Sequence, residues 1–326
     1  MTATDTISSD HGDILRGTSC LVLGGGGFIG THLCRGLTHR GARVHGFGRA
    51  PAYRDVLRGI RWTTAEFSDR AALARAIDGS DIIFHVLGGT TPESSNKDPV
   101  ADLQGCTTAA LEMLEICRIS NVRKIVFVSS GGTVYGIAKT VPIPETASTE
   151  PICAYGISKL AVEKYLHLYR HLHGLDYMVL RIANPFGAYQ APDRRQGVIA
   201  AIVHRILQNE PVEIWGDGRV VRDFIYIEDV VSALIEVVGY CGPYRVFNVG
   251  SGVGRSILDV VAEIAMVLDK PRLVPIHKPG RVTDVPINIL DISLIERETG
   301  WKPKTEWRRA LAITASWLQS MSKSAL

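Results

Sequence analysis

The chain has 326 residues, of which 46% are hydrophobic and 21% are charged, and its formal net charge is +3. This composition is typical of a globular protein with one large domain or two closely joined ones. The charge is too small to indicate nucleic acid or a membrane surface as a partner. No apolar run approaches the ~20 residues that a membrane span needs.

The start of the chain, MTATDTISSDHGD, is polar and lacks the apolar segment of a secretory signal. The six cysteines form no C-x-x-C pair and share no metal-ligand spacing with the ten histidines. We therefore expect a cytoplasmic protein with reduced thiols and no metal site.

In chain order, the first half alternates predicted strands and helices. Residues 20–23 predict a short buried strand, followed by a glycine-rich turn and a helix with Ile29, Leu33 and Leu37 at helical spacing. Further strands are predicted at 42–48, 60–67, 80–88, 123–130 and 176–183, and further helices at 69–77, 101–120 and from 154 onward. This alternation predicts an α/β fold with a doubly wound parallel sheet of the Rossmann type.

From residue 183 onward, Pro and Gly interrupt the pattern, and short strands are predicted at 212–216, 222–227 and 245–250. We expect a flexible tail at 1–14, a dinucleotide-binding Rossmann domain at 15–182 and a smaller α/β substrate-binding lobe at 183–326. Part of 221–250 is expected to pack back on the Rossmann domain. Ligands of open α/β sheets bind outside the carboxyl ends of the strands, so a cleft between the two parts is the expected site.

The turn GGGGFIG places Gly24, Gly27 and Gly30 between the first strand and the first helix. Glycine allows a tight turn and lets a pyrophosphate approach the N–H groups of the helix N-terminus. A flexible glycine loop is the alternative, but the strand–turn–helix context favours a dinucleotide. The second strand ends HGFGRAP, with Arg49 where an acidic residue would bind the 2′-OH of NAD. Arginine suits a 2′-phosphate better, which favours NADP slightly over NAD.

The stretch AYGISKLAVEKY, residues 154–165, carries Tyr155 and Lys159 four positions apart on a predicted helix. Residues at this spacing share one helix face, so the phenol and the ammonium could form one site. The spacing alone leaves open that both are amphipathic side chains on a helix surface.

Several motifs together resemble the extended short-chain dehydrogenase/reductases. They are GGGGFIG, SSGGTVYG, YGISK, RIANPFGA, IWGDGRVVRDFIYIEDV, FNVGSG and DVPINILDISLIERETGW, and they extend over nearly the whole chain. Within that group, the chain is similar to the NAD-dependent epimerase/dehydratase family typified by UDP-glucose 4-epimerase.

The resemblance implies that Tyr155 exchanges a proton with a sugar hydroxyl and that Lys159 binds the nicotinamide ribose. A free phenol has a pKa near ~10, and a neighbouring cation favours the phenolate. The family also supplies a third hydroxyl, but SSGGTVYG has Gly131 where a serine is expected. Thr133 is the favoured substitute and Ser130 the second. Because Gly132 and Thr133 replace the acid and base of the 4,6-dehydratases, dehydration is not expected.

The resemblance also implies two sets of binding residues. The cofactor set comprises Gly24, Gly27, Phe28, Ile29, Gly30, Arg49, Glu66, Phe67, Leu87 and Lys159. The substrate set comprises Asn184, Arg222, Arg281, Asp284 and Asn288. Asn288 stands where the epimerase has a bulky tyrosine, which implies room for a 2-N-acetyl group, and Asp102 stands where the family has asparagine.

We therefore expect a nucleotide-sugar 4-epimerase of the UDP-glucose or UDP-N-acetylglucosamine type, with a nucleotide-diphosphate sugar as substrate. An NADPH-dependent reductase of nucleotide-4-keto-sugars is the alternative, and a non-catalytic NADP-binding sensor is a third interpretation. The helices at 101–118 and 155–172 are apolar around much of their circumference. With the resemblance, this implies a homodimer that pairs through these helices.

Overall fold

The computed structural model describes residues 14–88, 90–191, 197–280 and 285–324. Its centre is a seven-stranded parallel sheet in the order β10-β6-β5-β4-β1-β2-β3. The strands are β1 (Ser19–Leu23), β2 (Arg43–Gly48), β3 (Arg61–Thr64), β4 (Ile82–His85), β5 (Lys124–Ser130), β6 (Asp176–Ile182) and β10 (Val246–Val249). The predicted α/β fold with a doubly wound parallel sheet is confirmed.

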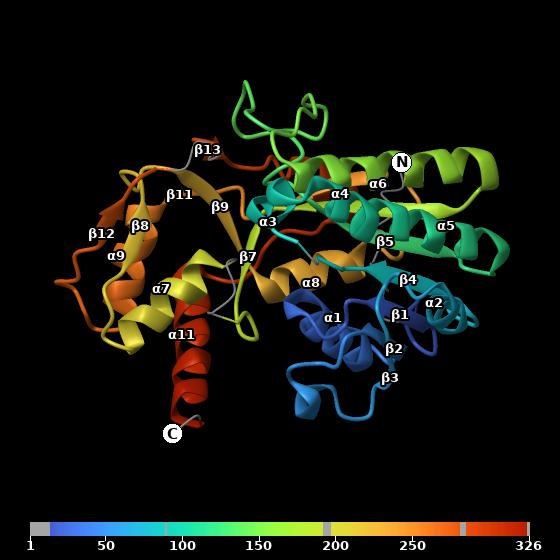
Figure 1. Cartoon of the computed structure of the whole chain (residues 1–326), viewed down its shortest axis with the longest axis horizontal. Helices are drawn as coiled ribbons and strands as arrows, with labels where there is room; N and C mark the ends of the chain where they lie inside the picture. Colours follow the sequence, from blue (N-terminus) through green and yellow to red (C-terminus); the bar gives the residue numbers. More distant parts are fainter. Residues whose placement is uncertain (1–13, 89, 192–196, 281–284, 325–326) are drawn as a thin grey trace, which may run out of the picture.

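Helices cover both faces of this sheet (Figure 1). One face packs against α1 (Phe28–His39) and α8 (Ile227–Glu236). The other packs against α2 (Arg70–Ile77), α5 (Ala109–Ile119) and α6 (Ala154–His173). Strands buried on both faces are apolar without alternation, as in β5, where six consecutive residues from Lys124 are buried.

The second half of the chain contributes to both parts of the molecule. Strand β10 pairs with β6, and α8 lies beside α1 although almost 200 residues separate them in sequence (Figure 1). A Cβ on Gly36 of α1 would lie only 2.8 Å from Val231 Cγ1 of α8, so glycine permits this close packing. The boundary at residue 183 stays a prediction.

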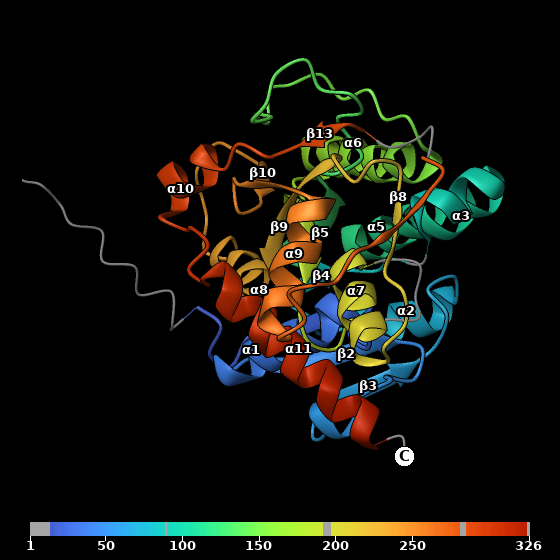
Figure 2. The ribbon, with the colours of Figure 1, turned by 90° about the vertical axis from the view of Figure 1, so that its left-hand side faces the viewer.

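Most other elements of the second half form a smaller lobe, which lies to the left in Figure 1 and toward the viewer in Figure 2. Strand β9 (Val221–Tyr226) pairs with β7 (Asn184–Phe186), β11 (Gly254–Ser256) and β13 (Ile287–Asn288). Strands β8 (Glu213–Trp215) and β12 (Ile276–Lys278) form a second small sheet. The helices of the lobe are α7 (Val198–Leu207), α9 (Ile257–Val267) and α11 (Trp307–Ser324), whereas α10 (Ser293–Thr299) packs against β10 of the central sheet.

One predicted helix differs in the structure. The segment 101–120 contains the end of α4 (Pro99–Asp102), a π-helix at Leu103–Thr108 and then α5. Gly105 and the adjacent threonines are weak helix formers, and this is where the helix widens. The short helix α3 (Pro92–Lys97), which precedes α4, was not predicted.

Candidate active site

The glycine turn lies at the carboxyl end of β1. Gly24 has a φ of +87°, a conformation that favours glycine. A Cβ on Gly30 would lie 2.1 Å from the carbonyl oxygen of Gly24, so no other residue fits there without moving the turn. The N–H groups of Phe28 and Ile29, in the first turn of α1, have no acceptor inside the helix. This compact turn, ending at an open helix N-terminus, fits a pyrophosphate.

Lys159 is buried beside this turn. Its ammonium donates to the carbonyl oxygens of Leu87, at 3.1 Å, and Val128, at 3.0 Å. Leu87 in turn lies against Gly24, whose Cβ would be 3.1 Å from the Leu87 Cα. An ammonium has three N–H donors, so one remains without an acceptor among the described residues.

Tyr155 lies on the same helix, with its ring centroid 5.7 Å from the Lys159 ammonium. The structure thus brings together the two residues whose spacing first suggested a pair. The Phe127 ring lies on another side of the ammonium, with its centroid at 4.8 Å.

His85, at the end of β4, lies between the rings of Phe67 and Phe127. Burial lowers the pKa of His85 to about 3, and the charge of Lys159 acts in the same direction. The imidazole is therefore neutral near pH 7, and neither ring nitrogen has a hydrogen-bond partner among the described residues. No sequence pattern indicated a functional role for His85, apart from its place at the end of a strand.

The loop after β5 holds the candidates for the third hydroxyl. A Cβ on Gly131 would lie 2.5 Å from Leu290 Cδ1, so a side chain there would meet the core instead of the cleft. The Thr133 hydroxyl is buried and has no partner among the described residues. The backbone carbonyl oxygen of Thr133 lies 2.9 Å from the position that a Cβ on Gly156, the residue after Tyr155, would occupy. Ser130 is half-buried at the end of β5.

Three predicted substrate residues lie on neighbouring strands of the lobe. Arg222 of β9 is paired in register with Asn288 of β13, and β7, which begins at Asn184, pairs further along β9. Arg222 donates to the carbonyl oxygen of Val285, at 2.5 Å, and Asn184 to that of Asp223, at 3.0 Å. Arg281 and Asp284 lie outside the described residues.

Asn288 connects the lobe to the loop after β5. Its side chain is 1% exposed, and its Nδ2 donates to the carbonyl oxygen of Gly131 at 3.1 Å. Its Oδ1 has no partner among the described residues. A buried polar atom without a partner is uncommon in a folded protein.

The other predicted cofactor residues surround the glycine turn. Phe67 and Leu87 are half-buried, whereas Glu66 and Arg49 are exposed. Arg49 follows β2 directly and has no hydrogen-bond or ion-pair partner within the described parts of the chain.

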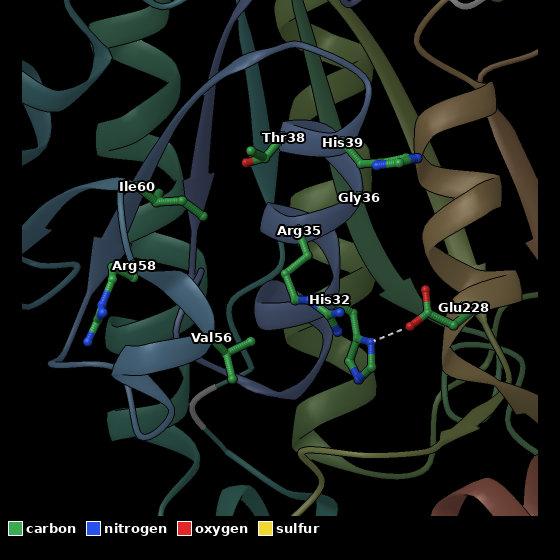
Figure 3. Close-up of a pocket in the computed structure, with 9 residues that line it drawn as sticks. All are labelled: His32, Arg35, Gly36, Thr38, His39, Val56, Arg58, Ile60 and Glu228. Atoms are coloured by element: carbon green, nitrogen blue, oxygen red, sulfur yellow. Dashed lines mark hydrogen bonds and ion pairs between the residues drawn. The ribbon is translucent and has the colours of Figure 1, made fainter.

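A hollow on the flank of α1 lies apart from these residues (Figure 3). The basic side chains of Arg35, His39 and Arg58 line it, together with Glu228 and His32. His32 Nδ1 lies 2.8 Å from Glu228 Oε1, and its Nε2 lies 2.8 Å from the Ala188 carbonyl oxygen. These bonds join α1 to α8 and to the segment after β7, so they support the packing of the two halves.

Among the described residues, no cluster of His, Cys, Asp or Glu could hold a metal ion. Within the same residues, no helix is both long and apolar enough to cross a bilayer.

A Rossmann sheet with this glycine turn, and with a buried lysine and a tyrosine beside it, defines a nicotinamide-dinucleotide enzyme of the short-chain dehydrogenase/reductase class. The particular family follows from comparison with known proteins. Residues 20–250 match the NAD dependent epimerase/dehydratase family, and the chain belongs to it. The predicted family is confirmed.

Similar proteins include two kinds of sugar-nucleotide enzyme. The chain is 30% identical to a UDP-glucose 4-epimerase of Mycolicibacterium smegmatis, over 93% of this chain and 99% of the relative. It is also 30% identical to a dTDP-4-dehydro-6-deoxyglucose reductase of Escherichia coli, over 88% of this chain and 93% of the relative.

Among solved structures, the chain is similar to a UDP-glucose 4-epimerase of Thermotoga maritima with UDP-glucose. The TM-score is 0.90 at 32% identity, covering 94% of this chain and 100% of the other. The chain is thus an NAD(P)-dependent sugar-nucleotide enzyme.

Proposed function

We propose that this protein is a nucleotide-sugar 4-epimerase acting on UDP-glucose or UDP-N-acetylglucosamine. The observation that carries the proposal is the meeting of three parts near the carboxyl ends of β4 and β5. Lys159, 5.7 Å from the Tyr155 ring, is hydrogen-bonded to Leu87 beside the glycine turn. The substrate strands reach the loop after β5 through the bond from Asn288 to Gly131.

The residues of the chain divide the chemistry between them. The glycine turn and Lys159 would hold a nicotinamide dinucleotide, which would supply reversible hydride transfer at carbon 4 of the sugar. Tyr155 takes the proton from the hydroxyl on that carbon and gives it back in the return step. The positive charge of Lys159 favours the phenolate while the proton is away. Thr133 donates its unpartnered hydroxyl to the reacting sugar oxygen.

The substrate strands would hold the diphosphate and the sugar. Arginine suits a diphosphate because its planar fork of donors matches phosphate oxygens, which is the role we propose for Arg222. Asn184 contacts the same group, and Arg281 and Asp284 complete the set. The small Asn288 leaves this wall of the site open to a 2-N-acetyl group, so both sugar types are accepted.

NAD is the cofactor typical of the family, and Arg49 supports a preference for NADP. An exposed guanidinium after β2, without a protein partner among the described residues, is suited to a 2′-phosphate. A preference for NADP would also suit the alternative function, an NADPH-dependent reductase of 4-keto-sugars, to which the relative from Escherichia coli corresponds.

We also propose that two copies pair through α6 and the segment before α5, in the cytoplasm. Ala110, Leu114 and Leu166 are buried within the protomer, whereas Leu103 is 50% and Leu168 41% exposed. Ile157 and Leu172 extend the exposed apolar surface along α6. Sedimentation at micromolar concentration should give a dimeric mass, and a monomer would contradict this proposal.

The test of function is incubation of the purified protein with UDP-, dTDP- and GDP-sugars, without added cofactor and then with it. An epimerase forms the 4-epimer and consumes no reduced cofactor. A reductase acts only on 4-keto-sugars and consumes NADPH stoichiometrically. Loss of reduced cofactor in step with product would overturn the epimerase proposal.

A further inference from the structure

The first turn of α6, which carries Tyr155, is capped by side chains from α3. The residue before the helix, Cys153, makes no side-chain capping bond, although the first N–H groups of a helix lack acceptors inside it. Asn96 Oδ1 accepts a hydrogen bond of 2.8 Å from the N–H of Ala154. Ser95 Oγ accepts one of 3.1 Å from the N–H of Tyr155 itself.

One of the two caps, Ser95, is held in place within α3. Ser95 is completely buried and donates its hydroxyl hydrogen to the Thr91 carbonyl oxygen at 2.7 Å. Its oxygen therefore faces Tyr155 as an acceptor. Reciprocal bonds between Thr91 and Ser94 stabilise the start of α3.

A third bond joins the same region to α6 one turn later. Asp102 is 2% exposed, and its carboxylate accepts hydrogen bonds from Ser158, at 2.6 Å, and from Thr90, at 2.5 Å. The side chains of the segment 90–102 therefore hold both the backbone start of α6 and the turn between Tyr155 and Lys159.

The Lys159 ammonium is held elsewhere, by the carbonyl oxygens of Leu87 and Val128 at the ends of two strands. The relative position of the phenol and the ammonium therefore depends on where α3 holds the start of α6. Catalytic groups need to be placed within ~0.5 Å of their productive geometry, and a displacement of ~1 Å can cost ~100-fold in rate.

We propose that Ser95 and Asn96 are positioning residues, which cap α6 and thereby place the Tyr155 phenol relative to Lys159. This inference rests on the catalytic role proposed for Tyr155. Neither residue is among the proposed cofactor-binding or substrate-binding residues, so their loss should lower kcat and leave KM and cofactor affinity nearly unchanged.

The test compares four variants with the wild type for kcat, KM, cofactor affinity and amide hydrogen exchange. Asn96→Ala removes one cap at an exposed position, where no buried void results. Ser95→Ala removes the other. Asn96→Asp keeps the acceptor and adds a charge that a helix N-terminus favours. Ser94→Ala is the matched control, because Ser94 stabilises α3 and makes no bond to α6.

We expect Asn96→Ala and Ser95→Ala to lower kcat by ~10- to 100-fold. Asn96→Asp should restore kcat to within about threefold of the wild type, and Ser94→Ala should leave it within the same range. Normal kcat in both alanine variants, or an equal loss in Ser94→Ala, would overturn the proposal.

Hydrogen exchange separates this inference from the proposed function. If the wild type turns over no nucleotide sugar, the proposed function fails, and exchange of the Ala154 and Tyr155 amides then decides whether the caps exist. Faster exchange in Asn96→Ala and Ser95→Ala than in the wild type supports capping, and unchanged exchange overturns it.

Discussion

Two groups of buried polar side chains differ in how fully they are hydrogen-bonded. One packs against the middle of α6, and the other lies around the loop after β5. Near the middle of the helix, the buried Glu163 binds Arg181, with Arg181 Nη2 at 2.6 Å, and accepts a bond from Ser129 at 2.5 Å. Arg181 also donates to the Tyr135 hydroxyl at 3.0 Å, which itself donates to Asn248 at 2.7 Å. Burial raises the pKa of Tyr135 to about 12, so its hydroxyl stays protonated.

The second group, around the loop after β5, is not fully hydrogen-bonded. The Thr133 hydroxyl and Asn288 Oδ1 are buried without partners among the described residues. An unpaired buried polar atom costs about 1–3 kcal/mol, and a ligand that supplied the missing bond would remove this cost. The comparison teaches that the Glu163 group is fully paired within the fold, whereas unpaired polar atoms remain where we propose that the substrate binds.

The largest expected effect on stability comes from Glu163→Ala. It leaves the guanidinium of Arg181 buried without its carboxylate, which should lower the free energy of unfolding by about 3–5 kcal/mol. Denaturant titration measures this change. As a control, Asp55→Ala breaks the exposed pair with Arg58 and should cost under about 1 kcal/mol. Equal losses in the two variants would show that the Glu163 group stabilises the fold no more than an exposed ion pair does.

In contrast to Glu163→Ala, Tyr155→Phe should lower activity and leave stability unchanged. We expect kcat to fall by at least ~100-fold, because the general acid/base is lost, while folding and cofactor binding are preserved. Steady-state rates and a denaturant titration of the same preparation test both statements. Near-normal turnover would show that Tyr155 is not the proton-transfer group.

Thr133→Val tests the unpaired group directly, because it removes the unpartnered hydroxyl with little change of shape. We expect kcat to fall by about fivefold, the effect of one lost hydrogen bond of about 1 kcal/mol, with stability unchanged or slightly raised. Ser130→Ala is the matched variant in the same loop. If Ser130→Ala has the larger effect on kcat, Ser130 supplies the hydroxyl instead.

A further expected effect concerns the binding of the cofactor and not the turnover. NADP(H) should bind more tightly than NAD(H) by about 1–3 kcal/mol, the contribution of one charged hydrogen bond from Arg49. Arg49→Ala should erase this preference and leave the affinity for NAD almost unchanged. Titration of cofactor-free protein with both dinucleotides, at fixed ionic strength, gives the answer. Equal affinities in the wild type would show that Arg49 does not contact the cofactor.

The sequence was most informative where function and local structure share the same residues. The glycine turn, the buried strands and the Tyr155–Lys159 spacing are local patterns, and the predicted sheet and the helix from residue 154 are both present. The π-helix at Leu103–Thr108 was missed, because an apolar run predicts a helix but not its width.

The contacts that complete the site could not be read from the sequence, because they join distant residues. Asn96 and Ser95 lie 58 and 60 positions before the residues that they cap, and Asn288 lies 157 positions after Gly131. The stretch TPES does carry a signal for the start of α3, since Thr91 and Ser94 form a capping box with Pro92 at the first helical position. No local pattern, however, indicates that α3 caps α6.

The most direct test of the central claim, that the cleft performs 4-epimerisation, uses UDP-glucose with deuterium at carbon 4. The protein is incubated with this substrate and an excess of unlabelled oxidised cofactor, NAD and NADP in parallel, and the epimers and the free cofactor are analysed by mass spectrometry and NMR. We predict that the deuterium stays at carbon 4 in both UDP-glucose and UDP-galactose, because the hydride leaves and returns within one closed site. Absence of the epimer, or loss of the label to the pool of free cofactor, would contradict the proposed function.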